Sequence, residues 1–161
     1  MMSRISDCVV EVDEGEMRVV ADGLSSSNGI HLSRKGTHAY VGELVGRAVS
    51  VYRVADRGSW TTEKRISLPF AVDNLTLRQD GKLLVSGHPK LLTLARGYQY
   101  DENSPSPSQV VLLDPATGRA NTLMQDDGTF FSGSSVAVPV DGRSILFGTT
   151  FGPSILRCPV G

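Results

Sequence analysis

Side chains with oxygen donors open three strand-like runs of this chain. Asn28 begins "NGIHL", Asp73 and Asn74 begin "DNLTL", and Ser135 begins "SVAVP". Ca²⁺ takes oxygen ligands from carboxylates, amides and carbonyls, whereas zinc prefers nitrogen and sulfur. If the runs meet in space, Asn28, Asp73 and Asn74 form a candidate calcium site. The alternative is purely structural, because Asn and Asp also favour turns and the starts of strands.

A histidine closes the strand-like run that follows this pair. His88 ends "LLVSGHP", and imidazole is the most common general acid or base because it exchanges protons near neutral pH. His88 is therefore the candidate catalytic residue, although a single histidine is more often a hydrogen-bonded structural residue. The chain contains no G-x-S-x-G elbow, no phosphate-binding glycine loop and no H-E-x-x-H motif. These signatures of serine hydrolases, nucleotide-binding enzymes and zinc peptidases are thus missing.

The elements that would position these side chains are short β-strands arranged in a repeat. Apolar runs are separated by turn pairs such as Lys35-Gly36, Asp80-Gly81 and Asp141-Gly142. The repeat units begin near residues 28, 74 and 135, and the turn glycine follows eight, seven and seven residues later. A period of about 40–50 residues with four short strands per unit is typical of β-propeller blades. Because the inner strand of each blade borders the central axis, we expect the polar starts to converge there.

The whole chain, residues 1–161, is predicted to be a single incomplete propeller domain of the all-β class. Its length allows about three four-stranded antiparallel blades, and a propeller closes with at least four. We expect a surface loop over 97–109, because "GYQYDENSPSPSQ" is polar and carries prolines. Open sheet edges pair readily with another chain, so self-association through the blade edges is a further expectation.

Composition and charge exclude several classes of protein. The 161 residues carry a net charge of −1 without a basic stripe, which argues against nucleic-acid binding. No apolar run approaches the roughly 18 residues of a transmembrane helix. The N-terminal "MMSRISDCVVEVDEGE" has no apolar core of a secretory signal, and no compartment is predicted. Cys8 and Cys158 lie in apolar runs and are expected to be buried thiols, with a bond between the chain ends as the alternative.

The motifs together resemble the paraoxonase/arylesterase family, six-bladed propellers of the calcium-dependent lactonase type. The resemblance begins near "MRVVADGLSSSNGI", continues through "LPFAVDNLTL" and "LLVSGHPK", and ends in "SILFGTTFGPSILRC". It covers nearly the whole chain and matches the C-terminal half of the family's propeller. It implies a hydrolase of small-molecule esters or lactones that uses Ca²⁺, with half of the active site present. The alternative is a non-catalytic propeller fragment or binding module from a truncated gene product.

The resemblance also implies roles for single residues. Asn28, Asp73 and Asn74 correspond to three ligands of the family's catalytic calcium, and His88 corresponds to a pocket histidine beside it. The implied walls of the substrate pocket are Leu44, Arg47, Ser135, Thr150 and Phe151. Arg47 departs from the resemblance, because the family often has histidine at this position. The remaining calcium ligands come from earlier blades of the family's propeller.

Overall fold

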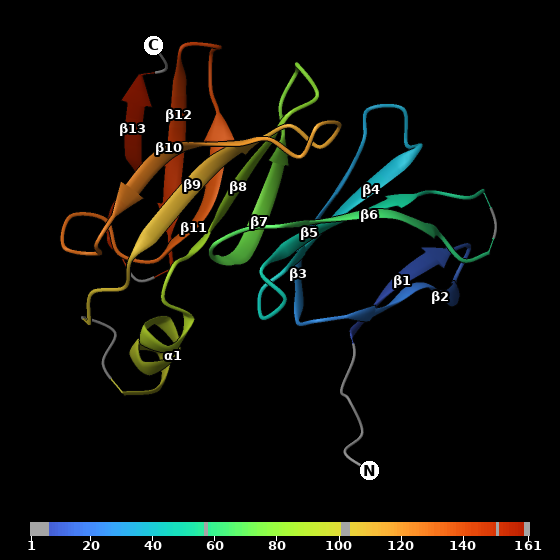
Figure 1. Ribbon diagram of the computed structural model, residues 1–161, viewed down its shortest axis with the longest axis horizontal. Helices are drawn as coiled ribbons and strands as arrows, with labels where there is room; N and C mark the ends of the chain where they lie inside the picture. The colour runs from blue at the N-terminus through green and yellow to red at the C-terminus, as the bar shows by residue number, and fades with distance from the viewer. Residues whose placement is uncertain (1–6, 57, 101–103, 151, 160–161) are drawn as a thin grey trace.

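The computed structural model describes residues 7–56, 58–100, 104–150 and 152–159, and these form four antiparallel sheets and one helix (Figure 1). The elements are β1 (Asp7–Asp13), β2 (Glu16–Leu24), β3 (Ser27–Leu32), β4 (His38–Glu43), β5 (Ala48–Arg53), β6 (Thr61–Ser67), β7 (Ala71–Leu77), β8 (Leu83–His88), α1 (Leu91–Tyr100), β9 (Ser108–Leu113), β10 (Ala120–Asp126), β11 (Ser134–Pro139), β12 (Ser144–Thr149) and β13 (Leu156–Pro159). We number the sheets in chain order: sheet one is β1–β2, sheet two β3–β6, sheet three β7–β10 and sheet four β11–β13.

The sheets have the architecture of propeller blades. Within each sheet every strand pairs antiparallel with its neighbour in the chain, so that each is a simple meander. Sheets two and three are complete four-stranded blades, and the flanking sheets have two and three strands. The prediction of an all-β, partial propeller of about three blades is therefore confirmed. The inner strands β3, β7 and β11 lie next to one another, with β7 in the middle.

Within sheet three, β8 is buried on both faces, and this explains why its sequence lacks an alternating pattern. Successive side chains of a strand point to opposite faces. Leu83 and Val85 pack into the cluster between sheets two and three, whereas Leu84 packs toward sheet four. All six residues of β8, from Leu83 to His88, are buried. A continuously buried strand therefore lies between the two core clusters, and His88 stands at its end.

The predicted surface loop is shorter than the sequence suggests. Residues 97–100 belong to α1, and β9 already begins at Ser108, so the expectation of a loop over 97–109 was wrong at both ends. The helix is anchored by Leu94, which is buried, in a segment rich in leucine and other good helix formers. Its ten residues are too few for the apolar period to stand out in the sequence. Within the ranges given above, no helix is long and apolar enough to cross a membrane.

The cysteines do not behave as a buried pair. Cys8 is exposed on β1, and Cys158 is half-buried on β13, where it packs against the core between sheets three and four. Both thiols are free. The expectation of two buried strand thiols was therefore wrong for Cys8, because the outward face of sheet one has no further sheet packed on it among the residues described.

Candidate functional site

All three inner strands carry a β-bulge at the polar residues singled out by the sequence. On β7 the pairing with β8 jumps from Val72–Gly87 to Leu75–Val85, so that Asp73 and Asn74 together oppose one residue. On β3 the pairs Ser27–Glu43 and Ile30–Val41 leave an extra residue in the segment 28–29. On β11 the extra residue is Ser135, between the pairs Ser134–Thr149 and Val136–Gly148. A bulge re-aims the side chains it carries and is common beside active sites.

Asp73 is the centre of a buried polar contact. Its side chain is almost buried, and Oδ2 lies 3.0 Å from Nε2 of His88, which is fully buried. Its other oxygen, Oδ1, accepts a hydrogen bond of 3.1 Å from Nδ2 of Asn74. The same Nδ2 lies 3.2 Å from both the carbonyl oxygen and Oγ of Ser135. The bulges of β7 and β11 are thus tied together through one amide.

Asn28 reaches this cluster through a close approach of two backbones. A Cβ atom on Gly29 would lie 2.7 Å from the carbonyl oxygen of Asp73 and 2.8 Å from Cα of Asn74. Only glycine permits this approach, so β3 lies directly against the bulge of β7. The side chain of Asn28 itself is exposed. The structure therefore brings Asp73, Asn74 and Ser135 into contact and places the backbone beside Asn28 against them, on adjacent inner strands as the repeat predicts.

His88 is not a wall residue of an open pocket in this structure. Its ring is fully buried behind Asp73, and its described polar contact is with that carboxylate. The geometry suits a residue that orients Asp73, with Nε2–H donating to Oδ2. Which ring nitrogen carries the proton is decided by the hydrogen bonds around the ring.

The predicted pocket-wall residues that the structure describes lie at the same end of the blades. Leu44 is half-buried, and its amide donates to the carbonyl of Ser26 at 2.8 Å. Arg47 is exposed, has a left-handed backbone with φ of 49°, and donates from Nη1 to the carbonyl of Pro69 at 3.3 Å. Thr150 is half-buried, with its amide 2.9 Å from the carbonyl of Gly133. Phe151 lies outside the described residues. The pocket roles of these residues stay predictions.

The donors suit a hard cation in kind but are few in number. One carboxylate and two amide oxygens match the oxygen ligands that Ca²⁺ prefers. Both carboxylate oxygens of Asp73 are already engaged, by His88 and Asn74. Over the described ranges, no group of three or more His, Cys, Asp or Glu side chains is arranged to hold a metal. The cluster therefore fits part of a calcium site whose full coordination requires further oxygen donors.

Glu43 is a buried carboxylate beside the candidate site, paired with Ser27 across β3 and β4, and sequence reasoning missed it. This carboxylate is only 3% exposed at the end of β4 and receives Oγ of Ser50 at 2.7 Å, Nε of Arg65 at 2.9 Å and the amide of Ser25 at 3.0 Å. Burial alone would raise the pKa of Glu43, but the hydrogen bonds from Arg65, Ser50 and Ser25 outweigh it and hold that pKa below its ordinary value. Glu43 thereby fixes the segment that leads into Asn28. Its signal in the sequence is a lone acid directly after the apolar "AYVG".

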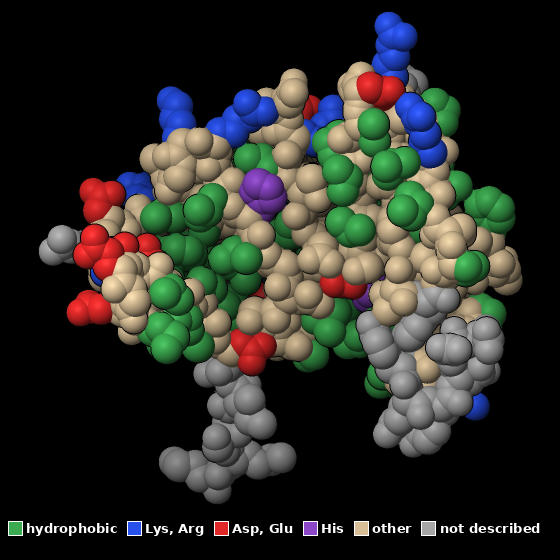
Figure 2. All heavy atoms as spheres, turned by 180° about the vertical axis from the view of Figure 1, so that it is seen from behind, with side chains coloured by type: hydrophobic (Ala, Val, Ile, Leu, Met, Phe, Trp, Pro, Cys, Tyr) green, Lys and Arg blue, Asp and Glu red, His purple; other side chains and the backbone are tan. Residues whose placement is uncertain are grey.

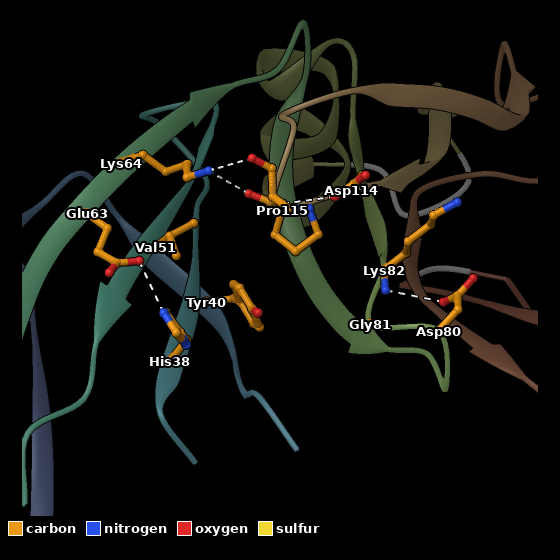
Figure 3. A pocket seen from close by; sticks show the side chains of 11 residues that line it. His38, Tyr40, Val51, Glu63, Lys64, Asp80, Gly81, Lys82, Asp114 and Pro115 are labelled. Carbon is orange, nitrogen blue, oxygen red and sulfur yellow. Dashed lines mark hydrogen bonds and ion pairs between the residues drawn. The ribbon is translucent and has the colours of Figure 1, made fainter. Parts of the chain in front are cut away.

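A separate cavity of about 400 Å³ lies between sheets two and three at the other end of the strands (Figure 3). Tyr40, Glu63 and Lys82 line it, together with the turn at Asp114. Lys64 Nζ crosses between the sheets and donates to the carbonyls of Pro115 and Ala116, at 2.9 and 2.8 Å. None of the predicted site residues lies here. We therefore assign this end to joining the blades and keep the bulge cluster as the candidate site.

Comparison with known proteins gives a consistent set of relatives. The model of the arylesterase family matches residues 2–159. Human serum paraoxonase/arylesterase 1 is 32% identical over 149 residues, which cover 89% of this chain and 40% of the human protein. Rabbit serum paraoxonase/lactonase 3 is 34% identical over 140 residues, covering 84% of this chain and 38% of that protein. The chain thus spans about two fifths of the length of these relatives.

Solved structures confirm the fold at low sequence identity. The periplasmic gluconolactonase of Pseudomonas aeruginosa superposes with a TM-score of 0.59 at 16% identity, over 89% of this chain and 38% of that structure. A luciferin-regenerating enzyme superposes with a TM-score of 0.53 at 11% identity, over 84% of this chain and 41% of that structure. At such identities the likeness concerns the fold alone.

Proposed function

The chain belongs to the arylesterase family, and from that premise we propose that it carries part of the active site of a calcium-dependent hydrolase of esters or lactones. The observation that supports the proposal is the threefold bulge. Three successive blades each carry a bulge at an oxygen-bearing residue of the inner strand, and the three inner strands are neighbours. The chain spans about 40% of the length of the human relative, so a complete active site would draw the remaining donors from outside these blades.

In this proposal each residue of the cluster has its own role. Asn28, Asp73 and Asn74 hold the ion, which when bound supplies a Lewis acid for the carbonyl oxygen of the substrate. His88 donates from Nε2 to Asp73 and keeps the carboxylate in one orientation. Ser135 positions the amide of Asn74 through its carbonyl and hydroxyl oxygens. Leu44, Arg47, Thr150 and Phe151 are the proposed walls for the organic part of the substrate.

A calcium titration followed by a hydrolysis assay tests this proposal. We expect Ca²⁺ at about 100-fold excess over its Kd to raise Tm by roughly 5–10 °C, with no rise for Mg²⁺. Lactone and phenyl-ester hydrolysis should stop in EDTA and return with Ca²⁺. A chain that shows neither a calcium-dependent Tm nor EDTA-sensitive hydrolysis would instead be a non-catalytic propeller module.

Self-association is a second proposal, supported by the outward face of sheet one. Val10, Val12, Met17 and Val19 are 47–77% exposed there and pair across the two strands, Val10 with Val19 and Val12 with Met17. Acidic side chains gather at this end of the molecule (Figure 2). Sheet four, at the other end, exposes Val138 and the cation Arg143, while Arg157 there pairs with Asp141 at 2.9 Å. We propose that this acidic, apolar end packs against sheet four of a second copy.

Sedimentation velocity measures this association directly. We expect dimers or larger species at micromolar concentration, and a shift to monomers in the double variant Val12→Glu with Met17→Glu. The matched control is Val45→Glu, since Val45 is 59% exposed in the turn between β4 and β5. A strict monomer at all concentrations would contradict the proposal.

A further inference from the structure

Four buried polar atoms without hydrogen-bond partners gather between sheets three and four. They are Oγ of Ser86, Nδ1 of His88, Oγ of Ser106 and Oγ of Ser134, and each of these residues is 0% exposed. Among the residues the structure describes, the one other such atom is Nε1 of Trp60, which packs beside sheet one. Four of five unsatisfied atoms thus fall in a single polar seam that ends at the candidate site.

The strand register shows that these atoms share one seam. Ser86 and His88 lie two and four residues after Leu84 on β8. Their side chains therefore point to the same face of the strand as Leu84, which is the face toward sheet four. Ser86 is also the residue that opposes the bulge of Asp73 and Asn74. From the other side, the amide of Ser134 on β11 donates to Oγ of Ser108 at 2.8 Å.

Ser108 lies between Ser134 and His88. Gly87 of β8 pairs with Gln109 of β9. Because the two strands are antiparallel, the next position places Ser108 across from His88. Its own Oγ donates to the carbonyl of Phe131 at 2.7 Å. Ser106 lies beside the same loop, since its carbonyl accepts the amide of Gly133 at 2.8 Å. The four atoms therefore lie along the contact of β8 and β9 with β11 and the loop before it.

The chemistry of the seam fits water. Native proteins satisfy nearly all buried polar atoms, either directly or through internal water, and such a water typically makes about three hydrogen bonds. Hydroxyl groups can donate or accept, and a bare imidazole nitrogen accepts, so a water molecule can serve all of them. The four atoms carry no formal charge of their own. An ion has no charged partner among them.

We propose that the seam between sheets three and four binds ordered internal water, which links Ser86 and Ser134 to Nδ1 of His88. A water that donates to Nδ1 leaves the ring proton on Nε2, where it donates to Oδ2 of Asp73. Ser86 is then a positioning residue, because it acts on Asp73 through the water and His88. The water site stands on its own, and only its consequence for calcium binding rests on the proposed function.

Nuclear magnetic resonance of ¹⁵N-histidine-labelled protein tests this assignment without any activity assay. In the unaltered chain we expect a ring proton of His88 on Nε2, facing Oδ2 of Asp73, and an Nδ1 resonance shifted by an accepted hydrogen bond. A water cross-peak to the Nε2 proton or to Ser86 should also be present. A His88 protonated on Nδ1 would overturn the proposal.

Variants of Ser86 separate the water from simple packing. Ser86→Ala should weaken the hydrogen bond to Nδ1 and change its ¹⁵N shift, while Ser86→Thr keeps a hydroxyl and should restore much of it. Ser144→Ala is the matched control, since Ser144 is also a buried strand serine but lies on β12. An Nδ1 shift that is equal in the unaltered chain, Ser86→Ala and Ser144→Ala would overturn the proposal. Should Ser86→Ala fail to fold, the tautomer and cross-peaks of the unaltered chain still decide it.

Discussion

Replacing Gly29 with alanine is expected to destabilise the chain by about 3 kcal/mol and to move β3 away from β7. The added Cβ would lie 2.7 Å from the carbonyl oxygen of Asp73, 2.8 Å from Cα of Asn74 and 3.0 Å from the amide nitrogen of Leu75. All three are backbone atoms of a buried strand, so no side-chain rotation relieves the contact. Urea unfolding followed by circular dichroism measures the loss directly.

Gly148→Ala is the matched control for this variant. Its Cβ would also come close to a neighbour, Cγ1 of Val136 at 2.8 Å, but this atom is a side-chain methyl in the last sheet. We expect a loss of about 1 kcal/mol there, because the methyl can shift. Equal stabilities of Gly29→Ala and Gly148→Ala would show that β3 is not held against the bulge of β7 in solution.

The repeat predicted the neighbourhood of the site, because equivalent positions of successive blades must face the same axis. Asn28, Asp73 and Ser135 are distant in the chain, and the structure places them on three adjacent inner strands. The bulges were not predicted, although β7 carries a signal for one. Val72 and Leu75 both pack into the same core cluster, yet they are three residues apart. A regular strand would put them on opposite faces, so an extra residue between them is required.

The burial of His88 depends on contacts that the local sequence does not contain. Its position beside Asp73 follows from the pairing of Ala71 with His88 across β7 and β8, and it lies on the face of β8 that Leu84 turns toward sheet four. The same holds for Glu43, whose partner Arg65 lies 22 residues further along the chain. Long-range pairs of this kind are set by strand register, which single-sequence patterns specify weakly. The sequence therefore identified His88 without its buried environment, and it did not identify Glu43.

Asp73→Asn is expected to abolish the calcium-dependent rise in Tm and EDTA-sensitive hydrolysis. The substitution keeps the shape of the side chain but removes the one carboxylate of the cluster. It also puts an amide donor where Asp73 accepts hydrogen bonds at both oxygens, from Asn74 and from His88. We expect a stability loss of about 2 kcal/mol in the absence of calcium, because one of these partners is left unsatisfied. Isothermal titration with Ca²⁺ and thermal unfolding measure both effects.

Two further variants make the result specific to this site. His88→Gln keeps Asp73 as a calcium ligand but removes the imidazole that orients it. It should therefore weaken calcium binding roughly 10- to 100-fold without abolishing it. Asp80→Asn makes the same exchange at an exposed turn of sheet three, where the carboxylate accepts the amide of Lys82, and should leave the calcium response intact. If Asp73→Asn and Asp80→Asn respond to Ca²⁺ alike, the ion binds outside the bulges. The contact of His88 with Asp73 would then serve only to join β7 and β8 within sheet three.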